Sequence, residues 1–274
     1  MKELNPDVVK IAKNFMMFVK SVRNEFQTER PMDFLVGKSV SLRQGWEKAG
    51  QVWPAIESQD NYFVTMYTLL ENLEVRRSKE TWLSIGAGPA LYEIWLSKIA
   101  QMNFLVSDFS HQMCKSAKTI FDGTKVLSGS AARGGKIFHA AMDMESLGVK
   151  SNTVDQIISV NALHWAPDWR QVIKEMRRVI KADGLGFAYL VVSGASIKIE
   201  GANGEKKPVS DISQELVFDE LEKNQFEIFF SRIMLVKEGQ LGKPAQRYFI
   251  KARLNLKNFF SWREKSMKLS AYAA

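Results

Sequence analysis

Hydrophobic positions in the first part of the chain recur with helical spacing. Across residues 5–26, apolar side chains return every three or four positions, which predicts a helix with one apolar face. Asn5 suits its N-cap and Pro6 its first turn. The same spacing predicts a second helix over about residues 60–73. The first 80 residues are therefore expected to be mostly helical, as a packed appendage, the cover of a pocket or a dimer face.

From residue 81 onward, short strand-like runs alternate with helical segments. Strands are expected at 81–85, 103–107, 154–160 and 185–192, and helices at 91–100, 113–121 and 169–180. Strand–helix alternation in this order is typical of parallel βαβ units, so the fold class is α/β. Two longer strands are expected at 225–236 and 246–256, joined at 239–244.

The net charge of +8 on 274 residues concentrates near the end, where residues 237–274 hold 9 basic and 2 acidic side chains. In the last predicted strand, apolar residues alternate with Arg247, Lys251 and Arg253. Period-two alternation predicts that these charges face solvent. Only residues 258–263 remain as a candidate contact with a membrane or a nucleic acid.

Cysteine content and the lengths of the apolar runs suggest a location. Cys114 is the only cysteine, which excludes an intramolecular disulfide and a cysteine-based zinc site and fits a reducing compartment. No apolar run approaches the roughly 20 residues that span a membrane. We expect a soluble, cytoplasmic protein and no metal site.

Glycines between the first predicted strand and its helix suggest a ligand site. Residues 86–90 read Gly-Ala-Gly-Pro-Ala, and Asp108 closes the next strand, 22 residues after Gly86. Such a turn lets a ligand approach the backbone, and a carboxylate one strand over can hold ribose hydroxyls. Asp108 is alternatively a cap for the helix starting near Ser110. Leu91 stands where a dinucleotide-binding turn has its third glycine, so another nucleoside ligand is favoured.

Five segments in order resemble the class I S-adenosylmethionine-dependent methyltransferases, of the small-molecule, methyltransferase-11-like type. The segments are residues 83–90, 106–113, 143–147, 154–168 and 181–186. The resemblance implies a Rossmann-like, seven-stranded, mostly parallel sheet with an antiparallel closing strand. It divides the chain into an N-terminal helical extension or lid (1–80), a methyltransferase core (81–257) and a tail (258–274).

The resemblance also implies an activity and its participants. The cofactor is S-adenosylmethionine, and its methyl group passes by in-line displacement to an oxygen, nitrogen or carbon atom of a small molecule. A homodimer is an alternative that the sequence leaves open. A catalytically inactive, cofactor-binding or scaffold relative is the alternative. An RNA methyltransferase is disfavoured, because the catalytic tetrapeptides and cysteine motifs that many such enzymes carry are missing.

Positions that match the family's motifs acquire roles by resemblance. Backbone at Gly86 and Gly88 would line the methionine end of the cofactor, and Asp108 would hold the ribose. Asn161 would lie beside the sulfonium. The implied cofactor-binding set is Ser84, Gly86, Ala87, Gly88, Asp108, Phe109, Met113, Asp143, Met144 and Asn161.

The adenine end of the cofactor receives its contacts from two other segments. Phe109 would lie against the adenine ring, or else belong to the core. Asp143 would accept from the adenine amino group beside the Met144 backbone, or else be an ordinary turn residue.

Two residues depart from the family's pattern. Ser84 stands where an acid usually helps to hold the cofactor's ammonium group, and Ala90 replaces a third glycine. Losing a charge-assisted hydrogen bond would weaken binding about ten-fold unless another group compensates. Ser84→Asp is accordingly expected to strengthen cofactor binding.

His164 is the candidate general base, and with Asn161 it forms the predicted catalytic pair. His164 follows the fourth predicted strand, on the rim where substrate should bind, and an ordinary histidine pKa near 6.5 suits proton transfer. The alternative is a structural histidine packed beside Trp165. Asn161 would orient the substrate, and so could Tyr189 and Ser193.

Overall fold

The computed structural model describes most of the chain, in segments separated by gaps. The described residues are 5–25, 47, 59–75, 80–127, 135–193, 198–200, 206–208, 211–238 and 243–255. Residues 258–263, considered above as a membrane or nucleic-acid contact, and the rest of the predicted tail lie outside them.

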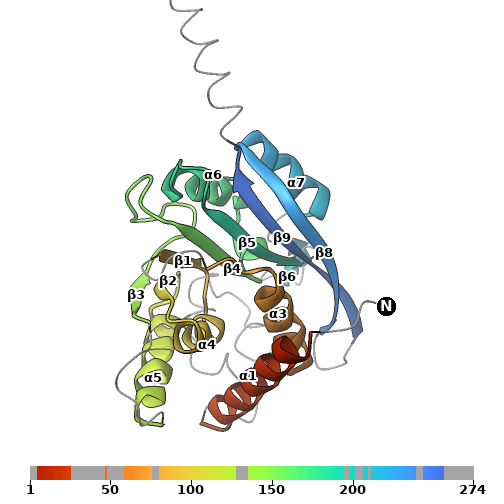
Figure 1. Ribbon diagram of the computed structural model, residues 1–274. Helices are drawn as coiled ribbons and strands as arrows, with labels where there is room; N and C mark the ends of the chain where they lie inside the picture. The colour runs from red at the N-terminus through yellow and green to blue at the C-terminus, as the bar shows by residue number, and fades with distance from the viewer. Residues whose placement is uncertain are drawn as a thin grey trace, which may run out of the picture.

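A seven-stranded sheet forms the centre of the molecule (Figure 1). Its order is β3-β2-β1-β4-β5-β9-β8, and the five strands from β3 to β5 are parallel to one another. β9 runs antiparallel to both of its neighbours. The bounds are β1 Thr81–Ile85, β2 Asn103–Asp108, β3 Ile137–Ala141, β4 Gln156–Val160, β5 Phe187–Ser193, β8 Phe226–Glu238 and β9 Lys243–Leu254. The predicted fold class and closing strand are confirmed.

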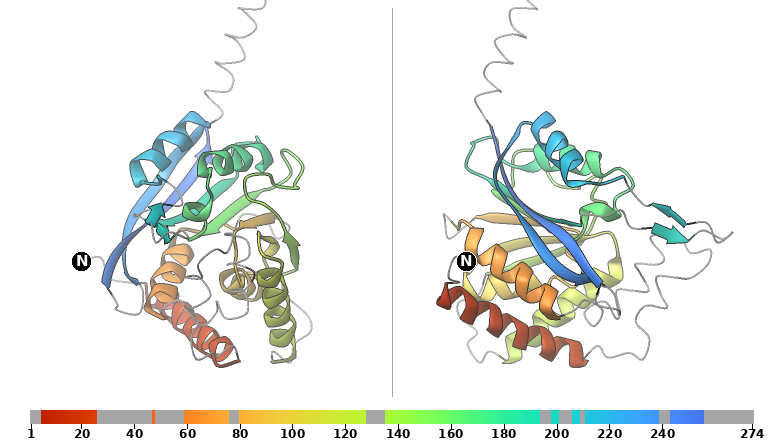
Figure 2. Two further views of the ribbon diagram at one scale, coloured as in Figure 1. Left: turned by 180° about the vertical axis from the view of Figure 1, so that it is seen from behind. Right: turned by 90° about the vertical axis from the view of Figure 1, so that its right-hand side faces the viewer.

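Helices cover both faces of this sheet (Figure 2). Side chains from α1, α3, α4 and α5 join one buried cluster with Trp82 of β1 and Tyr189 of β5. α6 and α7 pack on the other face, against the alternate residues Leu83 and Ala188. The bounds are α1 Pro6–Glu25, α3 Gln59–Asn72, α4 Leu91–Ile99, α5 His111–Leu127, α6 Trp169–Val179 and α7 Gln214–Lys223. Both faces of the parallel strands are therefore buried, as α/β folds require.

The sequence patterns predicted most of the helices and strands of the described residues, with some exceptions. These exceptions include β3, α7 and the small hairpin of β6 (Lys198–Glu200) and β7 (Lys206–Pro208). At the predicted N-cap of α1, the Asn5 side chain accepts a hydrogen bond from the Asp7 amide at 3.0 Å.

The prediction that the charges of the last strand face solvent is wrong for Lys251. This side chain is buried, its Nζ lies 2.5 Å from Glu74 Oε1, and it stands 4.4 Å from the centre of the Phe187 ring. Glu74 comes directly after α3, so the N-terminal helical segment covers the face that the alternation assigned to water. Among the described residues, no helix is long and apolar enough to cross a membrane.

Candidate functional site

The turn between β1 and α4 has a backbone that requires small residues. Gly86, Gly88 and Ala90 all adopt left-handed conformations, with φ of 63°, 55° and 55°. A Cβ atom on Gly86 would lie 2.3 Å from the Cβ of Ala162, the residue after Asn161. Glycine at position 86 therefore allows the turn to pass close to the loop that follows β4.

Asp108 holds this turn from the end of the neighbouring strand. Its Oδ2 accepts a hydrogen bond from the Gly88 amide at 2.8 Å, and its Oδ1 accepts one from the Ser110 amide at 2.9 Å. Burial raises the pKa of Asp108 to about 6, against the lowering effect of these hydrogen bonds. Each carboxylate oxygen still has a second lone pair for a ligand hydroxyl. Asp108 therefore accepts a local hydrogen bond from the Ser110 amide and also lines the pocket, and its contact with a ribose stays a prediction.

The start of α5 is bound by an acid from the N-terminal part of the chain. Glu47 accepts hydrogen bonds from the amides of His111 and Gln112, and from the Ser110 hydroxyl. These bonds occupy the free amides at the helix start and lower the pKa of Glu47, although its burial acts in the opposite direction.

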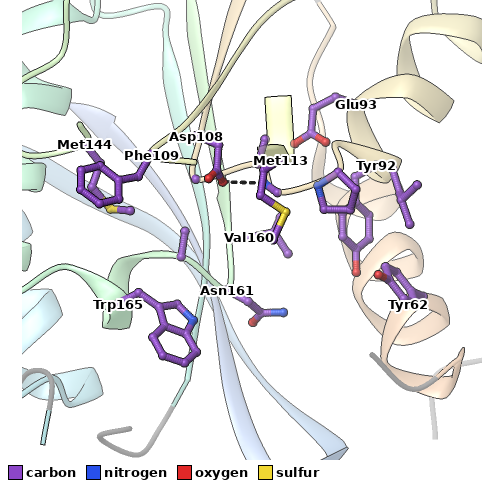
Figure 3. A pocket seen from close by; sticks show the side chains of 16 residues that line it. Tyr62, Tyr92, Glu93, Asp108, Phe109, Met113, Met144, Val160, Asn161 and Trp165 are labelled. Atoms are coloured by element: carbon purple, nitrogen blue, oxygen red, sulfur yellow. Dashed lines mark hydrogen bonds between the residues drawn. The ribbon is translucent and has the colours of Figure 1, made fainter. Parts of the chain in front are cut away.

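A pocket opens where the turn, the ends of β2 and β4, and α3 meet (Figure 3). Its walls are largely apolar and aromatic, with acids on two of the elements. The lining residues are Tyr62, Gly86, Ala87, Gly88, Pro89, Leu91, Tyr92, Glu93, Asp108, Phe109, Met113, Met144, Val160, Asn161, Ala162 and Trp165.

Most of the predicted cofactor-binding residues line this pocket. Asn161 follows β4 in a left-handed conformation with φ of 55°, which asparagine tolerates better than most residues, and its amide donates to Val191 O. Ser84 and Asp143 are not among the lining residues. Asp143 is exposed, and its Oδ1 accepts from the Glu145 amide at 2.9 Å, as in an ordinary turn. Its contact with adenine stays a prediction.

His164 lies in a different environment from the one its predicted role requires. It belongs to the short 3-10 helix η2 (Leu163–Trp165), is 4% exposed and is absent from the pocket lining. Burial, and secondarily Arg247, lower its pKa to about 3. The expected value near 6.5 is therefore wrong. The ring packs beside Trp165, with centroids 5.6 Å apart, and a catalytic role for His164 stays a prediction that this environment does not favour.

The other two side chains considered for orienting substrate are also buried outside the pocket lining. Tyr189 stacks on Trp82, and its hydroxyl accepts a hydrogen bond from the Glu74 amide at 3.0 Å. Ser193, at the end of β5, is 6% exposed. The pocket therefore leaves Asn161 as the predicted orienting residue.

A buried acid that the sequence analysis passed over contributes to the pocket. Glu93, in the first turn of α4, is 1% exposed, and its Oε1 accepts a hydrogen bond from the Ser84 hydroxyl at 2.6 Å. Burial raises its pKa to about 7. An acid directly after the glycine turn, in an otherwise apolar helix start, is the signal that could have identified it.

The order of the strands and the position of the pocket can be compared with those of known proteins. Residues 83–188 match the family model Methyltransf_11, a methyltransferase domain. This part of the chain, from β1 into β5, is therefore similar to the methyltransferase domain of the class I S-adenosylmethionine-dependent methyltransferases. The glycine cradle and the carboxylate of Asp108 fit the cofactor of the class, S-adenosylmethionine.

Solved structures share the fold at low sequence identity. An S-adenosylmethionine-dependent methyltransferase from Methanosarcina mazei is 19% identical, with a TM-score of 0.53 over 65% of this chain and 94% of that one. The YcgJ protein from Bacillus subtilis is 16% identical, with a TM-score of 0.50 over 69% and 97%. A Pyrococcus horikoshii protein is 15% identical, with a TM-score of 0.51 over 72% and 91%. A comparison with curated proteins finds no match.

Proposed function

We propose that this protein transfers the methyl group of S-adenosylmethionine to a small-molecule acceptor in the cytoplasm. The observation that carries the proposal is the pocket itself, in which the glycine turn and Asp108 are continuous with an aromatic wall. Tyr62 of the N-terminal segment contributes to that wall. A pocket lined largely by apolar and aromatic side chains suits a small acceptor better than a polymer.

The residues of the chain would bind and orient the cofactor and the acceptor rather than activate the methyl group. The bound cofactor supplies an already activated methyl group. Asp108 would bind the ribose hydroxyls, Phe109 and Met144 would flank the adenine, and Asn161 would position the acceptor. Holding reactants in line in a water-poor pocket supplies up to about 7–11 kcal/mol in the most favourable cases. A base is needed only for an acceptor that arrives protonated.

Methyl transfer can be tested directly with labelled cofactor. The full chain is incubated with methyl-labelled S-adenosylmethionine and, in separate reactions, a small-molecule extract or total RNA. Label in the small-molecule fraction is the expected result. Label in RNA would replace the proposal with an RNA methyltransferase.

A catalytically inactive relative is the second candidate, favoured by Ser84 in the place of the usual acid. The labelling experiment separates it from the first, since an inactive relative would bind S-adenosylmethionine in calorimetry but transfer no label to any fraction. Failure of the folded protein to bind millimolar cofactor would contradict both candidates.

A further inference from the structure

A buried carboxylate that forms no ion pair with the described residues lines the pocket. Glu93 Oε2 has no hydrogen-bond partner among the described residues, whereas Oε1 is held by Ser84. The ion pairs formed among these residues do not include Glu93. Leaving a buried acceptor unpaired is unfavourable, and a buried carboxylate is stabilised by a cation.

Glu93 and Asp108 lie on different elements of the same pocket. Glu93 projects from α4 beside Tyr92, and Asp108 lies at the end of β2 beside Phe109 (Figure 3). Asp108 already uses both oxygens to accept backbone hydrogen bonds. A ligand that reaches both acids would therefore place its hydroxyls at Asp108 and a cationic group at Glu93.

Resting on the proposed function, we propose that Glu93, positioned by Ser84, binds the α-ammonium group of the cofactor. Ser84 donates to Oε1 and leaves Oε2 to accept from the ligand. The acid that the strand lacks at position 84 is thus supplied from α4. Ser84 is a positioning residue in this arrangement, because it orients Glu93 and does not itself bind the ammonium group.

A ligand pair that differs only in the amino group tests the assignment. S-adenosylhomocysteine is compared by calorimetry with S-adenosyl-4-thiobutanoate, the same thioether without the ammonium group. A charge-assisted hydrogen bond in a buried site predicts that the wild-type chain prefers the amino-bearing ligand by about ten- to a hundred-fold. Equal affinities in the wild type overturn the assignment without any variant.

The Glu93→Gln variant should remove most of that preference. It should weaken S-adenosylhomocysteine binding and leave binding of the thiobutanoate unchanged within about two-fold. Glu215→Gln is the matched control, because Glu215 also lies in the first turn of a helix, α7, but is exposed. A Glu93→Gln variant that retains the full preference, or weakens both ligands equally, contradicts the inference. If neither ligand binds the folded wild type, the proposed function fails as well.

The Ser84→Asp variant is an independent test. The resemblance to the family predicts that it strengthens cofactor binding, whereas the role of Glu93 predicts that it weakens binding. The variant would place a second carboxylate against Glu93, whose oxygen lies 2.6 Å from the present hydroxyl. Two acids at that distance cannot both ionise readily. Ser84→Asp should therefore weaken S-adenosylhomocysteine binding, and stronger binding would show that position 93 does not hold the ammonium.

The pH dependence of ligand binding distinguishes an acid that binds the ligand from one that is merely structural. Burial raises the pKa of Glu93 to about 7, with no charged side chain of the described residues contributing. Binding an ammonium group there requires deprotonation, so wild-type affinity should rise between pH 5.5 and 7.5. Glu93→Gln should reduce that rise. Asp108, Tyr62 and Tyr92 also line the pocket and are common to both proteins. Parallel pH profiles would overturn the inference.

Discussion

A single carboxylate, Asp108, links the two loops that frame the pocket. Asp108→Asn would turn an amide donor toward the amide of either Gly88 or Ser110, each of which now donates to Asp108. We expect a loss of about 1–3 kcal/mol in the free energy of unfolding. Cofactor affinity should fall at least about ten-fold, because the ribose contact and the turn are both disturbed.

Urea unfolding and calorimetry check this expectation, with Asp183→Asn as the control. Asp183 makes a similar turn, accepting from the Leu185 amide at 2.9 Å, but on the surface and away from the pocket lining. An asparagine oxygen can still make that one bond. Equal losses of affinity in the two variants would show that Asp108 has no special relation to the ligand.

His164 should affect the free energy of unfolding through its protonation, and it should not affect turnover. The unfolded chain protonates this histidine near pH 6.5, whereas the buried ring does so only near pH 3. Its contribution is thus present above pH 6.5 and lost as the pH falls, by up to about 1.4 kcal/mol per pH unit. The raised pKa values of Glu93 and Asp108 act oppositely over part of this range.

Comparison of wild type with His164→Gln isolates the histidine from those acids. Their unfolding free energies, measured from pH 7.5 to 5, should diverge in slope below pH 6.5, and methyl transfer should persist in the variant. Parallel stability curves together with abolished transfer would restore His164 as the general base.

At the scale of elements, a glycine in the turn after β1 and a glycine in α5 should respond oppositely to alanine. Gly86→Ala meets Ala162 in a left-handed conformation, and we expect a loss of more than about 2 kcal/mol in unfolding free energy, with cofactor binding lost. Gly123→Ala, within α5, meets nothing within 4 Å and should gain about 1 kcal/mol with binding unchanged. Thermal unfolding and calorimetry measure both, and similar changes in the two variants would contradict the role of the turn.

The elements that the sequence predicted well carry strong local signals. β1 and the turn after it combine an apolar run with glycines, and their bounds agree with the prediction. β3 was not predicted because Ile137–Ala141 is only partly buried and lacks a continuous apolar run. Lys251 was misplaced because period-two alternation identifies two faces of a strand but cannot show that an N-terminal segment covers the second.

The candidate site was predictable where the backbone itself lines the pocket. The glycine turn and Asp108 each follow a predicted strand, and both line the pocket. Glu93 was missed because its importance arises from a tertiary hydrogen bond to Ser84, which no periodicity reports. The low pKa of His164 likewise depends on burial that the sequence around it does not specify.

At the scale of the whole molecule, the N-terminal helices and the pocket share an aromatic cluster. Phe15 of α1 is fully buried, with its ring centroid 6.1 Å from that of Tyr62 and 5.3 Å from that of Tyr92. Both tyrosines line the pocket. The predicted lid is therefore continuous with the wall of the site through contacts made inside the core.

Phe15→Ala tests whether those helices shape the pocket or only pack beside it. Removing the Phe15 ring leaves a cavity in the core and should lower the unfolding free energy by about 3–5 kcal/mol. It should also weaken cofactor binding, because Tyr62 and Tyr92 lose the ring that both contact. Met17→Ala, two residues away on α1 and 65% exposed, should change neither property appreciably. Urea unfolding and calorimetry on the two variants separate the alternatives: lost stability with unchanged affinity would make the segment a packed appendage, whereas a coupled loss makes it part of the site.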